Sequence, residues 1–141
     1  MKNKPTKSIY GIGVDICNSR RVYEKLSTQG EKFAEKILTS GEYTLYSKLE
    51  SKEQKAQFVA KCWAVKEAFV KALGTGFTGN FMWGDISYFS PSSNYTMVSR
   101  PMVVLSDRAM MDGMMRNRVV HLSVSDEVEN AIAFVTIEEV N

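Results

Sequence analysis

The sequence has few of the residues that build disulfide frameworks, metal clusters or membrane spans. Only two of its 141 residues are cysteine, Cys17 and Cys62, and His121 is the one histidine. Two cysteines supply neither a disulfide framework nor a zinc cluster. No stretch reaches the roughly 18 consecutive apolar residues of a membrane span. Free thiols and a first segment without a secretory cleavage site predict a cytoplasmic protein with no membrane contact.

The net charge is small and the composition is that of a globular protein. Eighteen Lys and Arg against sixteen Asp and Glu give a formal charge of +2, too small to indicate a nucleic-acid-binding protein by charge alone. Hydrophobic residues make up 44% and charged residues 24%, which excludes disordered, collagen-like and coiled-coil chains. The length predicts one domain over residues 1–141, large enough to bury a core.

The hydrophobic pattern predicts an α+β fold with a mainly antiparallel sheet packed against one long helix. Period-two alternation indicates a strand over 8–17, and apolar residues at spacings of three or four indicate a helix over 52–73. Thr39 and Glu42 form a capping box that opens a helix to about Leu49. The remaining expected elements are helices over 19–27, 31–38 and 106–116, and strands over 84–90, 101–106, 118–125 and 130–138, with a loop near 90–94.

Asp15 is the first candidate functional residue. It shares one face of its strand with Gly11 and Gly13, and glycine inside a strand can mark close approach by a ligand or by another backbone. The alternative is an exposed acid at the end of the strand, with the glycines accommodating a neighbouring helix.

The long helix carries a second set of candidates. Trp63, Glu67 and Lys71 follow one another at intervals of four residues and share one strip of the helix. Alone, a Glu–Lys pair at this spacing is a surface contact of about 0.2–0.5 kcal/mol. If Asp15 lies beside Glu67, however, the two carboxylates repel unless a cation lies between them. Magnesium fits two carboxylates, because it completes its coordination with water and substrate phosphates, and Lys71 could then neutralise a phosphate oxygen.

Two further groups are polar or basic. His121 shares a strand face with Ser123, a donor-rich surface that suits a phosphate or a ribose, although a lone histidine is more often a structural hydrogen-bonding residue. Arg20, Arg21 and Lys25 cluster near the N-terminus, either as a solvated face or as a docking patch for an acidic protein.

These motifs together resemble a known family. The segments IYGIGVDI, FAEKIL, WAVKEAFVKALGTG, GDI and HLSVS, in this order, are similar to the holo-[acyl-carrier-protein] synthases, the small class of 4′-phosphopantetheinyl transferases. The similarity runs from about Ile9 to Ile137. Its most specific part is the pair of motifs that places Glu67 after Asp15.

The resemblance implies a reaction and a set of site residues. Such enzymes move the phosphopantetheine arm of coenzyme A to a serine hydroxyl of an apo acyl carrier protein and release adenosine 3′,5′-bisphosphate. They are typically homotrimers with active sites between subunits. Either Glu67 or a metal-bound water would accept the serine proton. The implied roles are Mg²⁺ binding by Asp15 and Glu67, catalysis by Glu67, Lys71 and His121, coenzyme binding by Lys66, Gly74, Thr75, Gly76 and Ser123, and carrier docking by Arg20, Arg21 and Lys25.

Two positions depart from the family pattern. Cys62 stands where a basic residue is usual, and Asp126 stands where a second histidine is usual. The alternative function is a catalytically silent module that binds coenzyme A or a nucleotide, and the presence of Asp15, Glu67 and Lys71 argues against it. The carrier protein, its pathway and the range of acylated coenzyme A that is used are not encoded in these motifs.

Overall fold

The chain begins with one long strand, continues through four helices, and then forms two pairs of strands separated by a short helix. The computed structural model describes residues 6–90 and 100–140. In chain order, the elements are β1 (Lys7–Asn18), α1 (Ser19–Gln29), α2 (Glu31–Ile37), α3 (Ser40–Ser47), α4 (Lys52–Leu73), the short 3₁₀ helix η1 (Trp83–Asp85), β2 (Ile86–Phe89), β3 (Met102–Leu105), α5 (Asp107–Met111), β4 (Arg118–Asp126) and β5 (Asn130–Val140).

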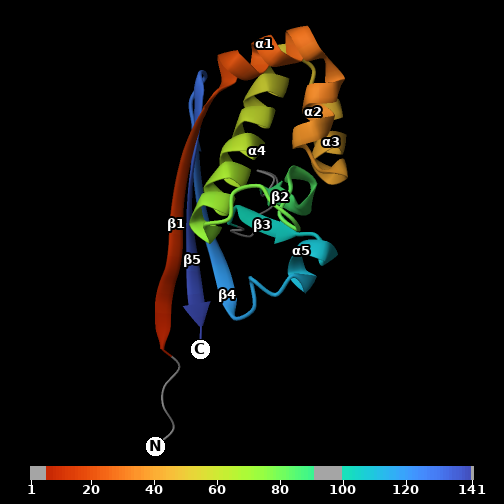
Figure 1. The fold of residues 1–141 in the computed structure, drawn as a ribbon. Coiled ribbons are helices and arrows are strands. Elements are labelled where there is room, and N and C mark those ends of the chain that lie inside the picture. Colours follow the sequence, from red (N-terminus) through yellow and green to blue (C-terminus); the bar gives the residue numbers. More distant parts are fainter. Residues whose placement is uncertain (1–5, 91–99, 141) are drawn as a thin grey trace, which may run out of the picture.

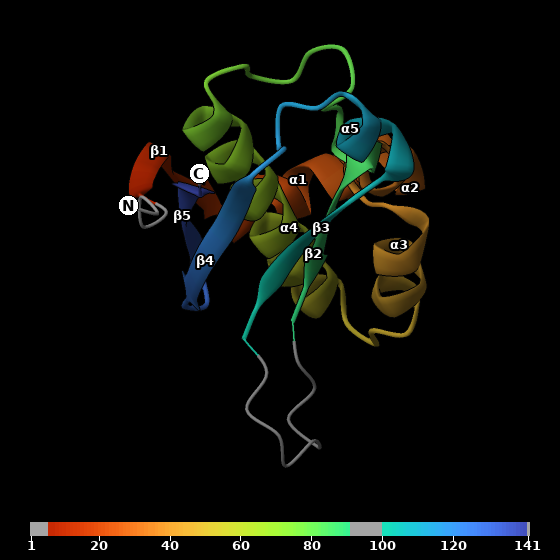
Figure 2. The same ribbon diagram turned by 90° about the horizontal axis from the view of Figure 1, so that it is seen from below.

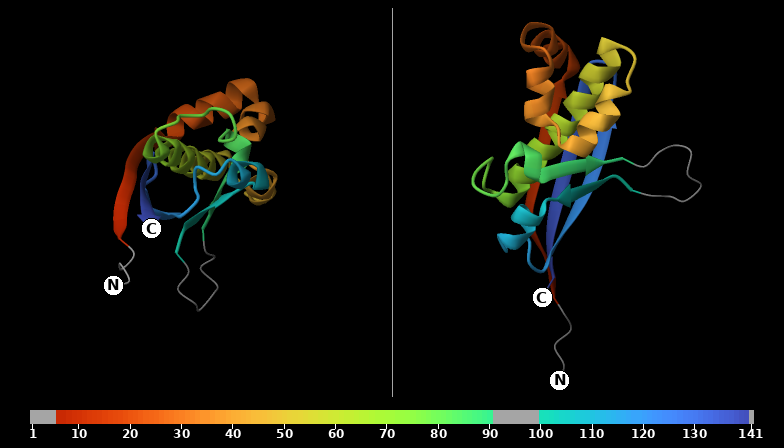
Figure 3. Two further views of the ribbon diagram at one scale, coloured as in Figure 1. Left: turned by 60° about the horizontal axis from the view of Figure 1, so that its bottom comes forward. Right: turned by 90° about the vertical axis from the view of Figure 1, so that its right-hand side faces the viewer.

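The strands form two antiparallel sheets. The larger sheet has the order β1-β5-β4, and the smaller one pairs β2 with β3. Helix α4 lies along the larger sheet, and the other helices lie on the same side of it (Figure 1). The smaller sheet lies next to β4 when the molecule is seen from below (Figure 2), and its strands run across the direction of the larger sheet (Figure 3, right). This arrangement confirms the predicted α+β fold with antiparallel strands and one long helix.

The two faces of the larger sheet differ in burial. The helix-facing side carries the buried Ala131, Ala133, Val135 and Ile137 of β5, which belong to the core that includes α4. The register pairs Val14 with Phe134 and Phe134 with Ser123, so the side chains of these three residues share the other side. We call that side the outer face; it carries the exposed residues Ile12, Val14, Ile16, Val119, His121, Ser123, Ile132 and Phe134.

Two glycines allow α4 to lie directly on β1. A Cβ atom at Gly11 would stand 1.9 Å from the carbonyl oxygen of Ala72, and one at Gly13 would stand 2.0 Å from that of Ala68. Any side chain at either position would therefore push the helix away from the strand. Of the readings that the sequence leaves open, close approach by another backbone is the correct one for the glycines.

Helix α4 begins and ends at local signals in the sequence. Ser51 and Gln54 form a capping box at its start, and Gly74 ends it with a φ of 82°, a left-handed conformation that glycine adopts without strain. The expected helix over 106–116 ends early, at Met111, and Gly113 follows with a φ of 90°.

Two other expectations need adjustment. The expected strand over 84–90 begins only at Ile86, because the preceding residues form η1. The loop expected near 90–94 lies largely outside the described residues. Within the described ranges, no helix is long and apolar enough to cross a membrane.

Candidate active site

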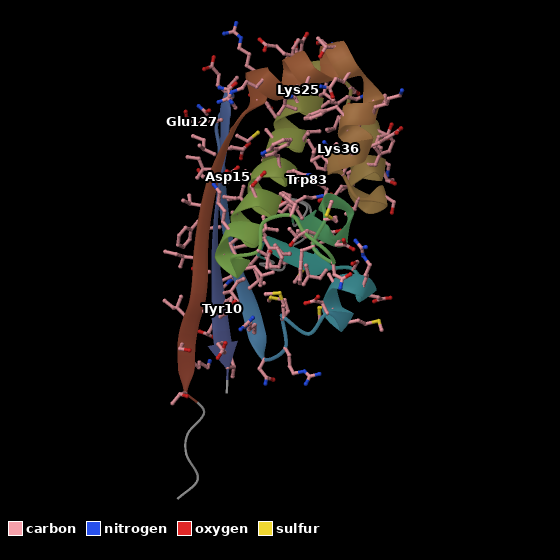
Figure 4. The ribbon with its side chains drawn as sticks, in the orientation of Figure 1. Tyr10, Asp15, Lys25, Lys36, Trp83 and Glu127 are labelled. Carbon is pink, nitrogen blue, oxygen red and sulfur yellow. The ribbon has the colours of Figure 1, made fainter. Side chains whose placement is uncertain are left out.

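Asp15 lies between β1 and α4 (Figure 4). Its side chain is 14% exposed, and its Oδ1 accepts a hydrogen bond from Lys71 Nζ at 3.0 Å. The same ammonium group donates to the carbonyl oxygen of Val14 at 3.1 Å. The second carboxylate oxygen, Oδ2, is buried and has no hydrogen-bond partner among the described residues. An unpaired buried carboxylate oxygen is costly, so this atom points to a missing ligand.

Glu67 completes an acidic pair with Asp15. Burial and the neighbouring charge of Asp15 raise the pKa of the Glu67 carboxyl group, and Lys71 acts in the opposite direction. The structure therefore brings Asp15 of β1 together with Glu67 and Lys71, which share one strip of α4. Both the orphaned oxygen and the repulsion between the carboxylates would be relieved by a divalent cation.

The donor set is small. No group of three or more His, Cys, Asp or Glu side chains that could hold a metal ion exists among the residues that the structure describes. A cation at Asp15 and Glu67 would thus take most of its ligands from water or from a bound molecule. That is the usual situation of magnesium in phosphate-transferring sites.

The turn that follows α4 begins at Gly74, three residues after Lys71 in the sequence. The amide of Gly74 donates to the carbonyl of Val70 at 2.9 Å, and Thr75 Oγ1 donates to the carbonyl of Gly76 at 2.8 Å. Gly76 has a φ of 63°. The positive φ angles of Gly74 and Gly76 favour glycine at both positions. No neighbouring atom lies within 4 Å of where a Cβ would stand, so a ligand can approach the main chain there.

Lys66 does not face this site. Its side chain is 0% exposed, and its ammonium group donates to Glu42 Oε1 at 2.6 Å, to the Ile37 carbonyl at 2.6 Å and to the Trp83 carbonyl at 3.1 Å. These three acceptors use all three N–H groups of the lysine. The prediction that Lys66 binds coenzyme A is therefore wrong, because all its N–H groups donate to acceptors in the protein interior.

His121 and Ser123 lie on the outer face of the sheet, whereas Asp15 lies on the helix-facing side. The register pairs Asp15 with Ala133 and Ala133 with Val124, which is half-buried, while the histidine side chain is 53% exposed. One chain therefore does not bring His121 to Glu67 and Lys71. The nearest acid to the imidazole is Glu138, with Nε2 and Oε1 3.9 Å apart.

A groove beside His121 contains a basic residue that the sequence did not single out. It has a volume of about 450 Å³ and is lined by residues of β2, β3, β4 and the segment before β3: Phe89, Arg100, Pro101, Met102, Val120, His121 and Leu122. Arg100 and His121 can both donate to a phosphate, and Pro101 and Phe89 provide apolar surface. No sequence motif connects residues this far apart, because only the packing of β3 beside β4 brings them together.

The three basic residues of α1 divide between two surfaces. Arg21 and Lys25, four residues apart, line a cavity of about 120 Å³ whose other walls include Cys17, Phe33 and Trp63. Arg20 lines a different groove, near the turn between β4 and β5. The structure thus brings Arg21 and Lys25 together and places Arg20 apart from them.

The two departures from the family pattern have different surroundings. Cys62 is buried, and desolvation together with the charge of Glu42 raises the pKa of its thiol well above the ordinary value. Asp126 lies at the end of β4 with its carboxylate 3.8 Å from the Lys61 ammonium group. Neither residue contributes to the shift in the pKa of Glu67.

Comparison with known proteins identifies the family of the chain. The sequence profile of the 4′-phosphopantetheinyl transferase superfamily matches residues 11–105. A holo-[acyl-carrier-protein] synthase of Wolbachia pipientis subsp. Culex pipiens is 38% identical over 129 residues, which cover 92% of this chain and 97% of that protein.

Solved structures give the same result. The holo-(acyl-carrier-protein) synthase of Bacillus anthracis in complex with CoA (3′,5′-ADP) is 32% identical, with a TM-score of 0.74 over 93% of this chain and 97% of that one. The enzyme of Neisseria meningitidis is 30% identical, with a TM-score of 0.79 over 92% and 98%. The chain belongs to the 4′-phosphopantetheinyl transferase superfamily. Within it, the relatives that match over nearly the full length are holo-[acyl-carrier-protein] synthases.

Proposed function

We propose that this protein transfers the 4′-phosphopantetheine arm of coenzyme A to a serine hydroxyl of an apo acyl carrier protein. The observation that carries the proposal is the orphaned Oδ2 of Asp15. The other oxygen of this carboxylate accepts a hydrogen bond from Lys71, and its charge raises the pKa of the neighbouring Glu67. This arrangement is suited to a pyrophosphate with its counter-ion. The nucleophile is the serine of the carrier, so the enzyme itself needs no activated serine or cysteine.

Asp15 and Glu67 would hold Mg²⁺. When bound, the ion neutralises the pyrophosphate charge and fixes its orientation, which is the main requirement of phosphoryl-type transfer. Asp15 contributes an oxygen that has no other partner, and Glu67 contributes a carboxylate whose ionised form a nearby cation favours.

Lys71 is placed to assist the leaving group. Its side chain is 51% exposed, so the ammonium group can turn from Asp15 toward a bound phosphate. In the reaction, the serine oxygen forms a bond to the phosphorus that carries pantetheine, and the bond from that phosphorus to the bridging oxygen breaks. Lys71 would donate a hydrogen bond to the departing adenosine 3′,5′-bisphosphate as its charge develops, and Glu67 lies in the same cluster as an acceptor for the serine proton.

A homotrimer would reconcile the position of His121 with this chemistry. The outer face exposes large apolar side chains, among them Ile12, Ile16 and Phe134, and such a continuous surface is typical of a subunit contact. In a ring of subunits, the outer face of one protomer contacts a different surface of the next. His121, Ser123 and Arg100 of one protomer would then bind nucleotide phosphates at the Asp15 and Glu67 cluster of its neighbour.

The carrier would dock on α1. Arg21, Lys25 and Trp63 line the same cavity, and Trp63 lies one turn before Glu67 on α4. An acidic partner on this helix would therefore present its serine near the phosphate site. The proposed substrates and the two free thiols are those of a cytoplasmic enzyme that serves fatty acid or related carrier-dependent synthesis.

Intact-mass spectrometry of an apo carrier protein tests the proposal directly. Purified protein, coenzyme A and Mg²⁺ should add the mass of the phosphopantetheine arm to the carrier, and a chelator should abolish the addition. Carriers encoded by the same genome are the appropriate substrates. If several of them show no mass shift while calorimetry detects Mg²⁺-dependent binding of coenzyme A, the protein is a binding module instead.

A further inference from the structure

A buried ion pair lies directly behind the active-site face of α4. Lys66 is 0% exposed and Glu42 is 3% exposed, with Nζ and Oε1 2.6 Å apart. Lys66 is the residue that immediately precedes Glu67. Burying two charges removes both from water, and an apolar pair of similar volume often gives equal or greater stability. The free energy of folding is therefore a weak explanation for this pair.

The ammonium group of Lys66 joins three elements to α4. Besides Glu42 of α3, it bonds the carbonyl of Ile37, the last residue of α2, and the carbonyl of Trp83, the first residue of η1. All these partners are main-chain atoms or a buried carboxylate, so none of them can move freely. The direction in which the Lys66 side chain leaves the helix is thus fixed from three sides.

The carboxylate of Glu42 is held as firmly. Its Oε1 also accepts from the Thr39 amide at 2.8 Å, and its Oε2 accepts from the Tyr88 amide of β2 at 2.7 Å. The charge of this carboxylate also contributes to the raised pKa of the Cys62 thiol, one helical turn before Lys66. The network therefore connects the start of α3 and strand β2 to α4 through Lys66.

We infer that Glu42 and Lys66 are positioning residues that fix the rotation of α4 about its axis and thereby direct Glu67 toward Asp15. Neighbouring residues on an α-helix point about 100° apart, so holding Lys66 determines where Glu67 points. On the opposite side, the contact of Gly11 and Gly13 sets the distance of the helix from β1. The inference rests on the proposed function, since it assigns the effect of the pair to the metal-binding carboxylate.

The two tryptophans provide an independent readout. Trp63 and Trp83 are the only tryptophans of the sequence, and their ring centroids lie 4.8 Å apart. Trp63 is on α4, and the carbonyl of Trp83 is held by Lys66. A rotation of α4 relative to η1 would change the coupling between these rings, which near-ultraviolet circular dichroism detects.

Three single variants test the inference: Lys66→Met, Glu42→Gln and the control Lys61→Met. Lys61 is on the same helix, but its ion pair with Asp126 spans 3.8 Å between side chains that are 30% and 43% exposed. For Lys66→Met and Glu42→Gln, we expect kcat to fall about 10- to 100-fold, because small misplacements of reacting groups cost that much. The Mg²⁺ concentration for half-maximal rate should rise, KM for the carrier should stay within about twofold, and the near-ultraviolet spectrum should change. Lys61→Met should match the wild type in each measurement.

The result that overturns the inference is a folded Lys66→Met or Glu42→Gln protein with wild-type kcat and Mg²⁺ dependence. If a single variant does not fold because it leaves a buried charge unpaired, the neutral pair Glu42→Gln/Lys66→Met decides, since it removes both charges. A double variant that is both folded and fully active refutes the positioning role. If the wild type has no transferase activity, the proposed function is refuted instead. Calorimetry of Mg²⁺-dependent coenzyme A binding then tests the inference: weaker binding by these variants supports it, and unchanged binding refutes it.

Discussion

Mixing two inactive variants tests whether His121 and Glu67 act at one site shared between subunits. Within a chain they lie on opposite sides of the sheet, so a shared site must take His121 from one protomer and Glu67 from the next. We expect His121→Ala and Glu67→Gln to lose transfer activity about 100-fold or more when each is assembled alone. In trimers assembled at random from equal amounts of both, a site is intact when both of its contributing chains carry the required residue. Each of the two contributing chains is of the required kind with a probability of about one half, so about a quarter of the sites are intact. About a quarter of wild-type activity should therefore return.

The assay is intact-mass spectrometry of the carrier after co-expression of the two variants, which allows subunits to assemble together. The matched control combines Glu67→Gln with Lys71→Ala. Because both residues come from the same helix, every site receives a defective helix from one chain or the other, and activity should not return. Co-expressed His121→Ala and Glu67→Gln chains that show only the mean of their separate residual activities would refute the shared site.

Four further predictions concern single residues. Gly13→Ala should lower the free energy of unfolding by at least about 1–3 kcal/mol in urea titrations, because its Cβ would stand 2.0 Å from the carbonyl oxygen of Ala68; an unchanged midpoint would contradict the backbone contact. Glu67→Gln should abolish transfer while the unfolding midpoint stays the same or rises, since one of two repelling carboxylates is removed. Arg21→Ala should raise KM for the carrier several-fold more than Arg20→Ala, which lies in a different groove; equal effects would remove the cavity from the docking surface. Asp85→Asn should cost about 2 kcal/mol at pH 7, because its arginine partner and two further donors hold the pKa of Asp85 below the ordinary 3.8. The stabilisation by ionised Asp85 is present above pH 4 and is lost as the pH falls through the lowered pKa of Asp85. The wild type and Asp85→Asn should therefore become equally stable in acid.

The part of the site that lies on regular elements could be predicted from the sequence. Period-two alternation placed Asp15 with Gly11 and Gly13, and the interval of four residues placed Glu67 with Lys71. The two glycines indicated close approach by a ligand or by another backbone, and the structure shows that the backbone is that of α4. These are local patterns, and the fold preserves them.

Residues that depend on packing between distant segments could not be predicted in the same way. Lys66 lies next to Glu67 in sequence, yet the helix turns it into the core, where its partner is the Glu42 carboxylate. The capping box accounted for one oxygen of Glu42 and left the amide of Tyr88 and the ammonium group of Lys66 unforeseen. Arg100 reaches the groove of His121 only because β3 packs beside β4.

The contact between Gly11, Gly13 and α4 has a consequence for how the metal site can vary. Two main chains meet there with no side chain between them, so no rotamer change can adjust their separation. The spacing between Asp15 and α4 is therefore set by backbone atoms alone. Substitutions in the core on the far side of the helix can change stability without changing that spacing, whereas a single added methyl group at either glycine alters it at once.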